Sequence, residues 1–174
     1  MNTEQWHNLV KEAKSDPELL HSLDIDALLE TLESENTDYL ENKTMISITQ
    51  EVYNKLTTFA FSKEKIQYYC DKLLGYRLVN QIYELRLQRG IKIFKIYDEK
   101  TGQTIRTPTL LAGAVMSIKF LEAGSYILFQ NLAGKIFNVK FDNYVVFQKL
   151  TDEEQLILLA YDQMQNTDED EDNS

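Results

Sequence analysis

The residue types that most often carry catalysis are few in this chain and far apart in its sequence. Its two histidines, His7 and His21, both lie in an acidic N-terminal stretch. A histidine general base must lie within hydrogen-bond reach of the group that it activates. Neither histidine lies near a plausible site, so the sequence indicates no hydrolase triad.

Metal and nucleotide chemistry are equally poorly represented. Together with the single cysteine, Cys70, the histidines make three possible zinc ligands, whereas a closed structural zinc site needs four. The chain contains no phosphate-binding loop and no dinucleotide-binding glycine motif. The acids of 168–172 lack the glycine turn of a calcium loop. We therefore expect no metal and no cofactor.

An enzyme that uses carboxylates such as Glu84 and Asp98 is a third alternative to the two binding functions described below. Each of these carboxylates is equally explained as surface charge, and Glu84 could pair with a nearby arginine. The sequence therefore predicts a non-catalytic protein.

A group of basic residues in the middle of the chain is a stronger lead. Aromatic residues are interleaved with them, and small β-barrels bind nucleic acid through positive grooves with aromatic stacking platforms. The candidate nucleic-acid-binding residues are Arg77, Arg86, Arg89, Lys92, Lys95 and Arg106. Aromatic residues of strands, however, usually belong to the core.

The net charge of −10 conceals a strong asymmetry along the chain. Residues 63–149 hold 14 basic and 7 acidic side chains, whereas residues 150–174 hold 9 acids and no base. Residues 1–62 hold 4 lysines against 12 acids. The basic middle could bind an anionic partner, or it could receive the acidic ends of the same chain.

The N-terminal residues 1–46 are expected to form an acidic helical arm and a loop. Asp16 can cap a helix that has Pro17 at its first position. Beyond it, acids surround an apolar stripe made of Ile25, Leu28, Leu29 and Leu32. This stripe either packs on the rest of the chain or binds a partner protein.

Residues 47–165 are expected to form the main domain. The pattern predicts a helix over 47–60 and a longer one from Ser62 to about Arg89, with a kink or break at Gly75 and a glycine cap at Gly90. After Gly90 the periodicity falls to two, and glycines recur at 102, 113, 124 and 134. This pattern is typical of short antiparallel strands.

Thr151 and Glu154 form a capping-box sequence that predicts a helix over about 152–164. Residues 166–174 are predicted to be a disordered acidic tail. The expected fold class is α+β, with N-terminal helices, a small antiparallel β-barrel or strongly bent sheet of five to six strands, and a C-terminal helix packed on it.

No apolar run approaches the roughly 20 residues that span a bilayer. The first residues lack the basic start and apolar run of a signal peptide. One cysteine cannot form an internal disulfide. We therefore expect an intracellular protein in a reducing compartment, with no membrane span.

Two segments carry a resemblance. Lys72 to Ile96, KLLGYRLVNQIYELRLQRGIKIFKI, and Phe147 to Tyr161, FQKLTDEEQLILLAY, are similar to segments of small uncharacterised proteins of nucleocytoplasmic large DNA viruses. The resemblance implies a viral or infected-cell context, with the host cytoplasm or the virion as its location. It implies no activity.

These observations favour a non-catalytic interaction module or scaffold that binds a protein partner through the acidic arm or an edge of the barrel. The alternative is a nucleic-acid-binding protein that uses the basic middle of the chain and is modulated by its acidic tail. Salt dependence separates the two functions, because phosphate contacts release counterions and apolar contacts do not.

Overall fold

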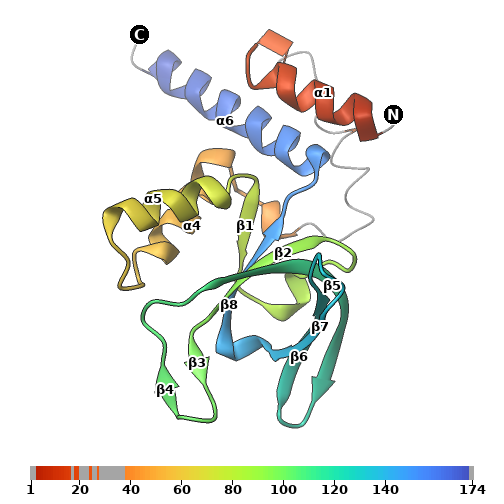
Figure 1. Ribbon diagram of the computed structural model, residues 1–174. Helices are drawn as coiled ribbons and strands as arrows, with labels where there is room; N and C mark the ends of the chain where they lie inside the picture. Colours follow the sequence, from red (N-terminus) through yellow and green to blue (C-terminus); the bar gives the residue numbers. More distant parts are fainter. Residues whose placement is uncertain (1–2, 17, 20–23, 25–26, 28–37, 173–174) are drawn as a thin grey trace. The chain divides into compact units, whose positions relative to one another are not determined.

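A computed structural model describes residues 3–16, 18–19, 24, 27 and 38–172 (Figure 1). The chain divides into two compact units, Gln50–Lys149 and a second that combines Met1–Thr49 with Leu150–Ser174. This division differs from the predicted domains, because residues 150–165 belong with the N-terminal residues. Each unit is described by itself below.

The unit Gln50–Lys149 is built on antiparallel strands, as predicted. Its main sheet has six strands in the order β1-β8-β2-β5-β6-β7, and β3 and β4 form a separate hairpin. The strands are β1 (Tyr76–Val79), β2 (Gly90–Lys95), β3 (Tyr97–Asp98), β4 (Gln103–Thr104), β5 (Leu110–Leu121), β6 (Gly124–Gln130), β7 (Ile136–Lys140) and β8 (Tyr144–Lys149). The α+β class is therefore confirmed.

The sheet is open in the part of the chain that the structure describes. Its end strands, β1 and β7, each pair with one neighbour, so the sheet does not close into a barrel. Strands β2, β5, β6 and β7 form a meander, and β8 returns after the 3-10 helix η3 (Phe141–Asn143) to pair with both β2 and β1.

Strand β5 is the longest strand and serves both halves of the sheet. Its first half, from Leu110 to Ala114, pairs with β2, and its second half pairs with β6. The register shifts by one residue between Val115 and Ser117, as in a β-bulge. Bulges bend a strand and increase its twist, and Figure 1 shows β5 curving strongly along its length.

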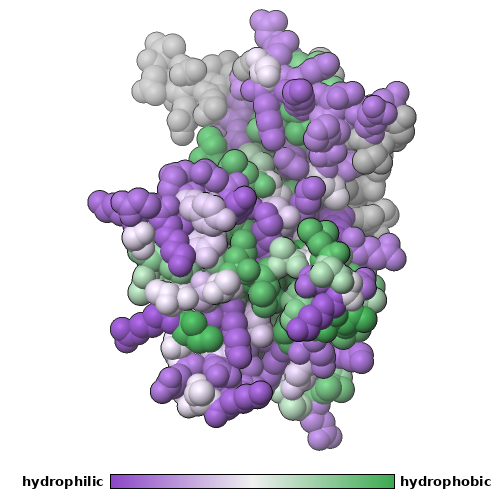
Figure 2. Space-filling model, in the orientation of Figure 1, coloured by the Kyte–Doolittle hydropathy of each residue, from purple (hydrophilic) through white to green (hydrophobic). Residues whose placement is uncertain are grey.

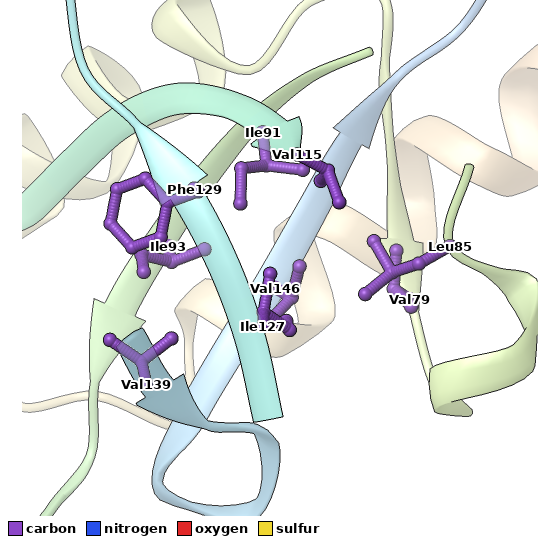
Figure 3. Close-up of a cluster of buried hydrophobic side chains, with 9 residues drawn as sticks. All are labelled: Val79, Leu85, Ile91, Ile93, Val115, Ile127, Phe129, Val139 and Val146. Atoms are coloured by element: carbon purple, nitrogen blue, oxygen red, sulfur yellow. The ribbon is translucent and has the colours of Figure 1, made fainter. Parts of the chain in front are cut away.

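The inner face of this sheet holds one core. Figure 3 shows its nine buried side chains, which come from six strands and from the loop after β1. They are Val79, Leu85, Ile91, Ile93, Val115, Ile127, Phe129, Val139 and Val146. Burying these nine apolar side chains stabilises the fold chiefly through the hydrophobic effect.

The outer face is covered over β1, β8 and β2. Helices α4 (Met45–Leu56) and α5 (Lys63–Lys72) contribute Val52, Leu56 and Tyr69 to a second core there. These side chains pack with Phe94 of β2 and Phe147 of β8. Strands β2 and β8 consequently contribute apolar side chains to the cores on both faces of the sheet.

The predicted long helix from Ser62 to Arg89 is wrong after its first ten residues. Ser62 caps α5 as expected, by accepting a hydrogen bond from the Lys65 amide at 3.3 Å. The helix ends at Lys72, because Gly75 adopts a φ of 75° that a continuing helix cannot accommodate. Strand β1 and the 3-10 helix η2 (Ile82–Glu84) follow, and Gly90 begins β2 instead of capping a helix.

In the second unit, helices α1 (Thr3–Ala13) and α6 (Asp152–Asp172) pack through Val10, Ala13, Leu156 and Ala160. The capping box is present. The Thr151 amide donates to Glu154 Oε2 at 2.8 Å, and the Glu154 amide donates to Thr151 Oγ1 at 3.1 Å.

Helix α6 extends beyond its predicted end near residue 164, and the segment predicted to be a disordered tail is helical as far as Asp172. Propagation of a nucleated helix costs little per residue, and the capping box provides the nucleus. The carboxylate of Asp162 in this helix accepts hydrogen bonds from the amides of Met45 and Ile46, which begin α4.

Gly113 of β5 lies very close to the backbone of β6, and this yields a test of the β5 bend. A Cβ added there would lie 2.4 Å from the Gln130 carbonyl oxygen, whereas a Cβ at Gly90 would have no neighbour closer than 3.8 Å. We expect Gly113→Ala to lower the free energy of unfolding by about 2 kcal/mol in urea denaturation. Gly90→Ala is the matched control, and equal losses in both variants would contradict the close approach.

Candidate functional site

Arg77, the first of the predicted nucleic-acid-binding residues, faces the protein interior. Its side chain is 3% exposed. It donates to the backbone oxygen of Glu84, and its Nη1 lies 3.5 Å from Glu84 Oε2. Its Nη2 also lies 3.4 Å from the side-chain oxygen of Gln148. Arg77 is therefore a structural residue that ties β1 to the loop following it.

Gln148 completes this buried arrangement from β8. Its amide oxygen accepts from the Arg86 backbone amide, and its amide nitrogen donates to the Arg86 carbonyl, both at 2.8 Å. These paired bonds hold the loop that contains η2 against the inner face of the sheet. Arg86 and Arg89 in this loop are half-buried, and both take part in further interactions.

The two carboxylates considered for catalysis lie in separate bonded networks. Glu84 accepts from Arg77 and from the Asn80 amide at 3.0 Å. Asp98 accepts from Lys95 Nζ at 3.1 Å and from the Lys100 amide within the β3–β4 hairpin. The hydrogen bond from Lys95 lowers the pKa of the Asp98 carboxyl, and the bond from the Lys100 amide adds to this effect. Both carboxylates are explained by local structure.

Lys92 lies among other lysines on the outer face of the sheet. Its Nζ donates to the backbone oxygen of Lys72, the last residue of α5, and lies 4.3 Å from the ring centroid of Tyr76. Tyr76 pairs directly with Lys149 across β1 and β8. Burial lowers the pKa of Lys92, and the positive charges of Lys72 and Lys149 lower it further.

A second tyrosine adjoins this group. Tyr68 of α5 is 55% exposed, and Lys72 Nζ lies 5.5 Å from its ring centroid. We call the five residues Tyr68, Lys72, Tyr76, Lys92 and Lys149 the lysine–tyrosine cluster. Sequence reasoning named Lys92 as a candidate site residue, but it missed Tyr68, Lys72 and Lys149, because these residues converge through strand pairing and the end of α5. Recognition of β1 as a strand beside β8 would have revealed Lys149.

A different surface lies on the outer side of β5, β6 and β7. Among the described residues, the core beneath α4 and α5 includes Leu110 at the start of β5 but no later residue of these three strands. Cross-strand register places three rows of side chains there, alternating with the inner-core residues. The rows are Ala114–Gln130–Ile136, Ser117–Leu128–Asn138 and Lys119–Tyr126–Lys140. We call these rows, together with Met116 at the bulge, the open face.

The open face combines apolar and basic side chains. Met116 is 43% exposed and Ile136 is 52% exposed. Figure 2 shows hydrophobic side chains gathered over the β5–β7 part of the sheet on one side of the molecule. Sequence reasoning missed the exposed apolar residues at the bulge and at the start of β7.

The remaining predicted site residues do not join either surface. Lys95 pairs with Asp98, and the side chain of Arg106 is exposed beyond the β3–β4 hairpin. The arm residues Ile25, Leu28, Leu29 and Leu32 lie outside the described residues. Asp16 does cap the turn that follows it, since its carboxylate accepts from the Glu18 amide at 3.0 Å.

The described residues contain no cluster of three or more histidine, cysteine or acidic side chains that could hold a metal ion. Burial raises the pKa of the Cys70 thiol, which is the opposite of what an activated nucleophile requires. In the same part of the chain, no helix combines the length and apolarity that crossing a membrane demands.

These features define an α+β protein with an open, bent antiparallel sheet and two distinct exposed surfaces. Comparison with protein-family models, with curated proteins and with solved structures found no match to this chain. The resemblance of two segments to viral proteins therefore remains a hypothesis.

The structural role of Arg77 can be separated from ligand binding by a stability measurement. Replacement by methionine removes hydrogen bonds to Glu84 and Gln148 and leaves their polar groups without this donor. We expect Arg77→Met to lower the free energy of unfolding by about 2 kcal/mol in urea denaturation. Arg106→Met, at an exposed arginine, is expected to change it by less than about 0.5 kcal/mol. Similar values for the two variants would show that the buried arrangement is not stabilising.

Proposed function

We propose that this chain is a non-catalytic module that binds a protein partner through the open face of β5, β6 and β7. The observation that carries the proposal is the exposure of Met116 and Ile136 on a sheet surface that α4 and α5 do not cover. Leu128 of β6 lies in the adjacent row of this surface, between Ser117 and Asn138, and is half-buried. Apolar side chains gathered on one exposed surface are a common feature of protein interfaces.

The edge of the sheet adds backbone groups to this surface. Strand β7 pairs only with β6 among the described strands, so the other side of Ile136–Lys140 is available to an added strand. Ile136, Asn138 and Lys140 point to the open face, while Phe137 and Val139 pack inward. An extended segment paired with β7 would gain main-chain hydrogen bonds and contact alternate side chains.

Charge determines which kind of segment fits. Lys119 and Lys140 lie on the open face, and of these two only Lys140 forms an ion pair within the described chain, with Glu99 at 3.4 Å. A partner segment that alternates apolar residues with Asp or Glu would complement both the apolar centre and the basic border. We therefore assign the open face to an acidic, extended segment of another protein.

Site-specific photocrosslinking tests this assignment. Ile136 is replaced by p-benzoylphenylalanine, the protein is irradiated in an extract of the cells that produce it, and crosslinked peptides are identified by mass spectrometry. We expect a defined protein whose crosslinked peptide is acidic and lies in an extended segment. Adding Met116→Glu should reduce the crosslinking yield about fivefold or more, because it buries a charge and repels the partner's acids.

Tyr83 provides the matched control position, because it is 69% exposed but lies in η2, away from the strands of the open face. The same crosslinker at Tyr83 should not capture the protein captured from position 136. Identical products from both positions, or a basic crosslinked peptide, would contradict the proposal.

A further inference from the structure

The lysine–tyrosine cluster concentrates positive charge in an unusual way. Lys72, Lys92 and Lys149 come from α5, β2 and β8. Lys92 Nζ lies over the ring of Tyr76, which pairs with Lys149 across β1 and β8, and Lys92 donates to the backbone oxygen of Lys72. Like charges at such proximity repel one another, and Lys92 is also partly removed from water. An anion bound among the three ammonium groups would relieve both penalties.

No carboxylate of the described chain provides that counter-charge. Between described residues of this unit, ion pairs join Arg77 to Glu84, Lys95 to Asp98 and Lys140 to Glu99, and none of these pairs includes a lysine of the cluster. Within the described residues, Lys92 donates its hydrogen bond to a backbone carbonyl. Lys72 and Lys149 have exposed side chains, so their ammonium groups are accessible to a ligand.

Gly90 of β2 brings the backbone close to these groups. A Cβ placed on it would lie 3.8 Å from both Lys149 Cβ and the Tyr76 hydroxyl oxygen, which is ordinary van der Waals contact. The lysine stem and the phenol hydroxyl therefore lie next to each other over the glycine. A phosphate oxygen can accept hydrogen bonds from ammonium and hydroxyl groups alike.

The aromatic members indicate which phosphate compound is favoured. Tyr68 presents a largely exposed ring next to Lys72, and the cluster continues through Lys92 to Tyr76 and Lys149. Cationic groups that alternate with an accessible aromatic ring suit a strand with phosphates and unstacked bases. A duplex hides its base faces and would use only the lysines.

We propose that the lysine–tyrosine cluster binds single-stranded nucleic acid, with a phosphate held among Lys72, Lys92 and Lys149 and a base stacked on Tyr68. This site differs from the sequence-based one, since it keeps only Lys92 of the predicted basic residues and adds Lys72, Lys149 and Tyr68. It is independent of the open face.

Fluorescence anisotropy with labelled oligothymidylate and oligouridylate of about 20 nucleotides, titrated with the full chain, tests the proposal. We compare wild type with Lys72→Gln/Lys149→Gln between about 50 and 200 mM NaCl. The double variant should bind about tenfold more weakly at the lower salt concentration. Its dependence of log affinity on log salt should be about 1.4 shallower, because two phosphate contacts are lost.

The matched control is Lys63→Gln/Lys100→Gln, which removes the same charge from two other exposed lysines of this unit. It should keep nearly wild-type affinity and salt slope. Equal weakening by both double variants would attribute binding to overall charge and overturn the site. Absence of binding by the wild-type protein would overturn it too.

A Tyr68→Leu variant and two competing ligands, duplex DNA and pyrophosphate, show which kind of phosphate compound the cluster binds. The tyrosine variant should lose about tenfold in affinity for the single strands and little for duplex DNA of equal length. Preferential binding of duplex, or displacement of the oligonucleotide by equimolar pyrophosphate, would replace the single strand by another phosphate ligand and overturn the proposal. Photocrosslinking from Ile136 reports on the open face separately, so failure of either proposal leaves the other testable.

Discussion

Strands β2 and β8 are buried on both faces, and this double burial is the constraint on which the rest of the larger unit depends. Phe94 and Phe147 pack outward beneath α4 and α5, while Ile93 and Val146 pack inward. All four side chains are at most 1% exposed. Because the outer faces of these two strands are apolar, helices α4 and α5 must cover that half of the outer face. The other half, over β5 to β7, is left for contacts outside this core.

The sequence predicted what local chemistry determines. The capping box at Thr151 and Glu154, the Ser62 cap and the hairpin around Gly102 all depend on residues within four positions of one another. The long helix failed because Leu78, Ile82 and Leu85 repeat at helical spacing although the first lies in β1 and the others in a loop. In the structure these residues are wholly or partly buried by tertiary packing and not on one face of a helix. A local sequence pattern cannot distinguish the two arrangements.

The prediction of site residues was limited in the same way, because it could use residue types and near neighbours but not tertiary packing. Six basic residues were selected for their type and their aromatic neighbours, yet their roles depend on which side of a strand each occupies. Arg77 shares the inner face with Val79, whereas Lys92 shares the outer face with Phe94. Only the strand assignment separates a structural arginine from an accessible lysine. The open face was missed for a related reason, since Met116 is exposed by a one-residue bulge.

The return of β8 to the beginning of the sheet has a consequence for how the protein is made. Tyr76 of β1 pairs with Lys149 of β8, so the edge strand β1 and its neighbour in the sheet come from widely separated parts of the chain. The meander from β2 to β7 can form from neighbouring segments, but β1 has no strand partner until β8 has left the ribosome. Such nonlocal pairing slows folding, because a long loop must close before the contact forms. During synthesis, β1 and the apolar sides of β2 would therefore remain exposed until the last strand is complete.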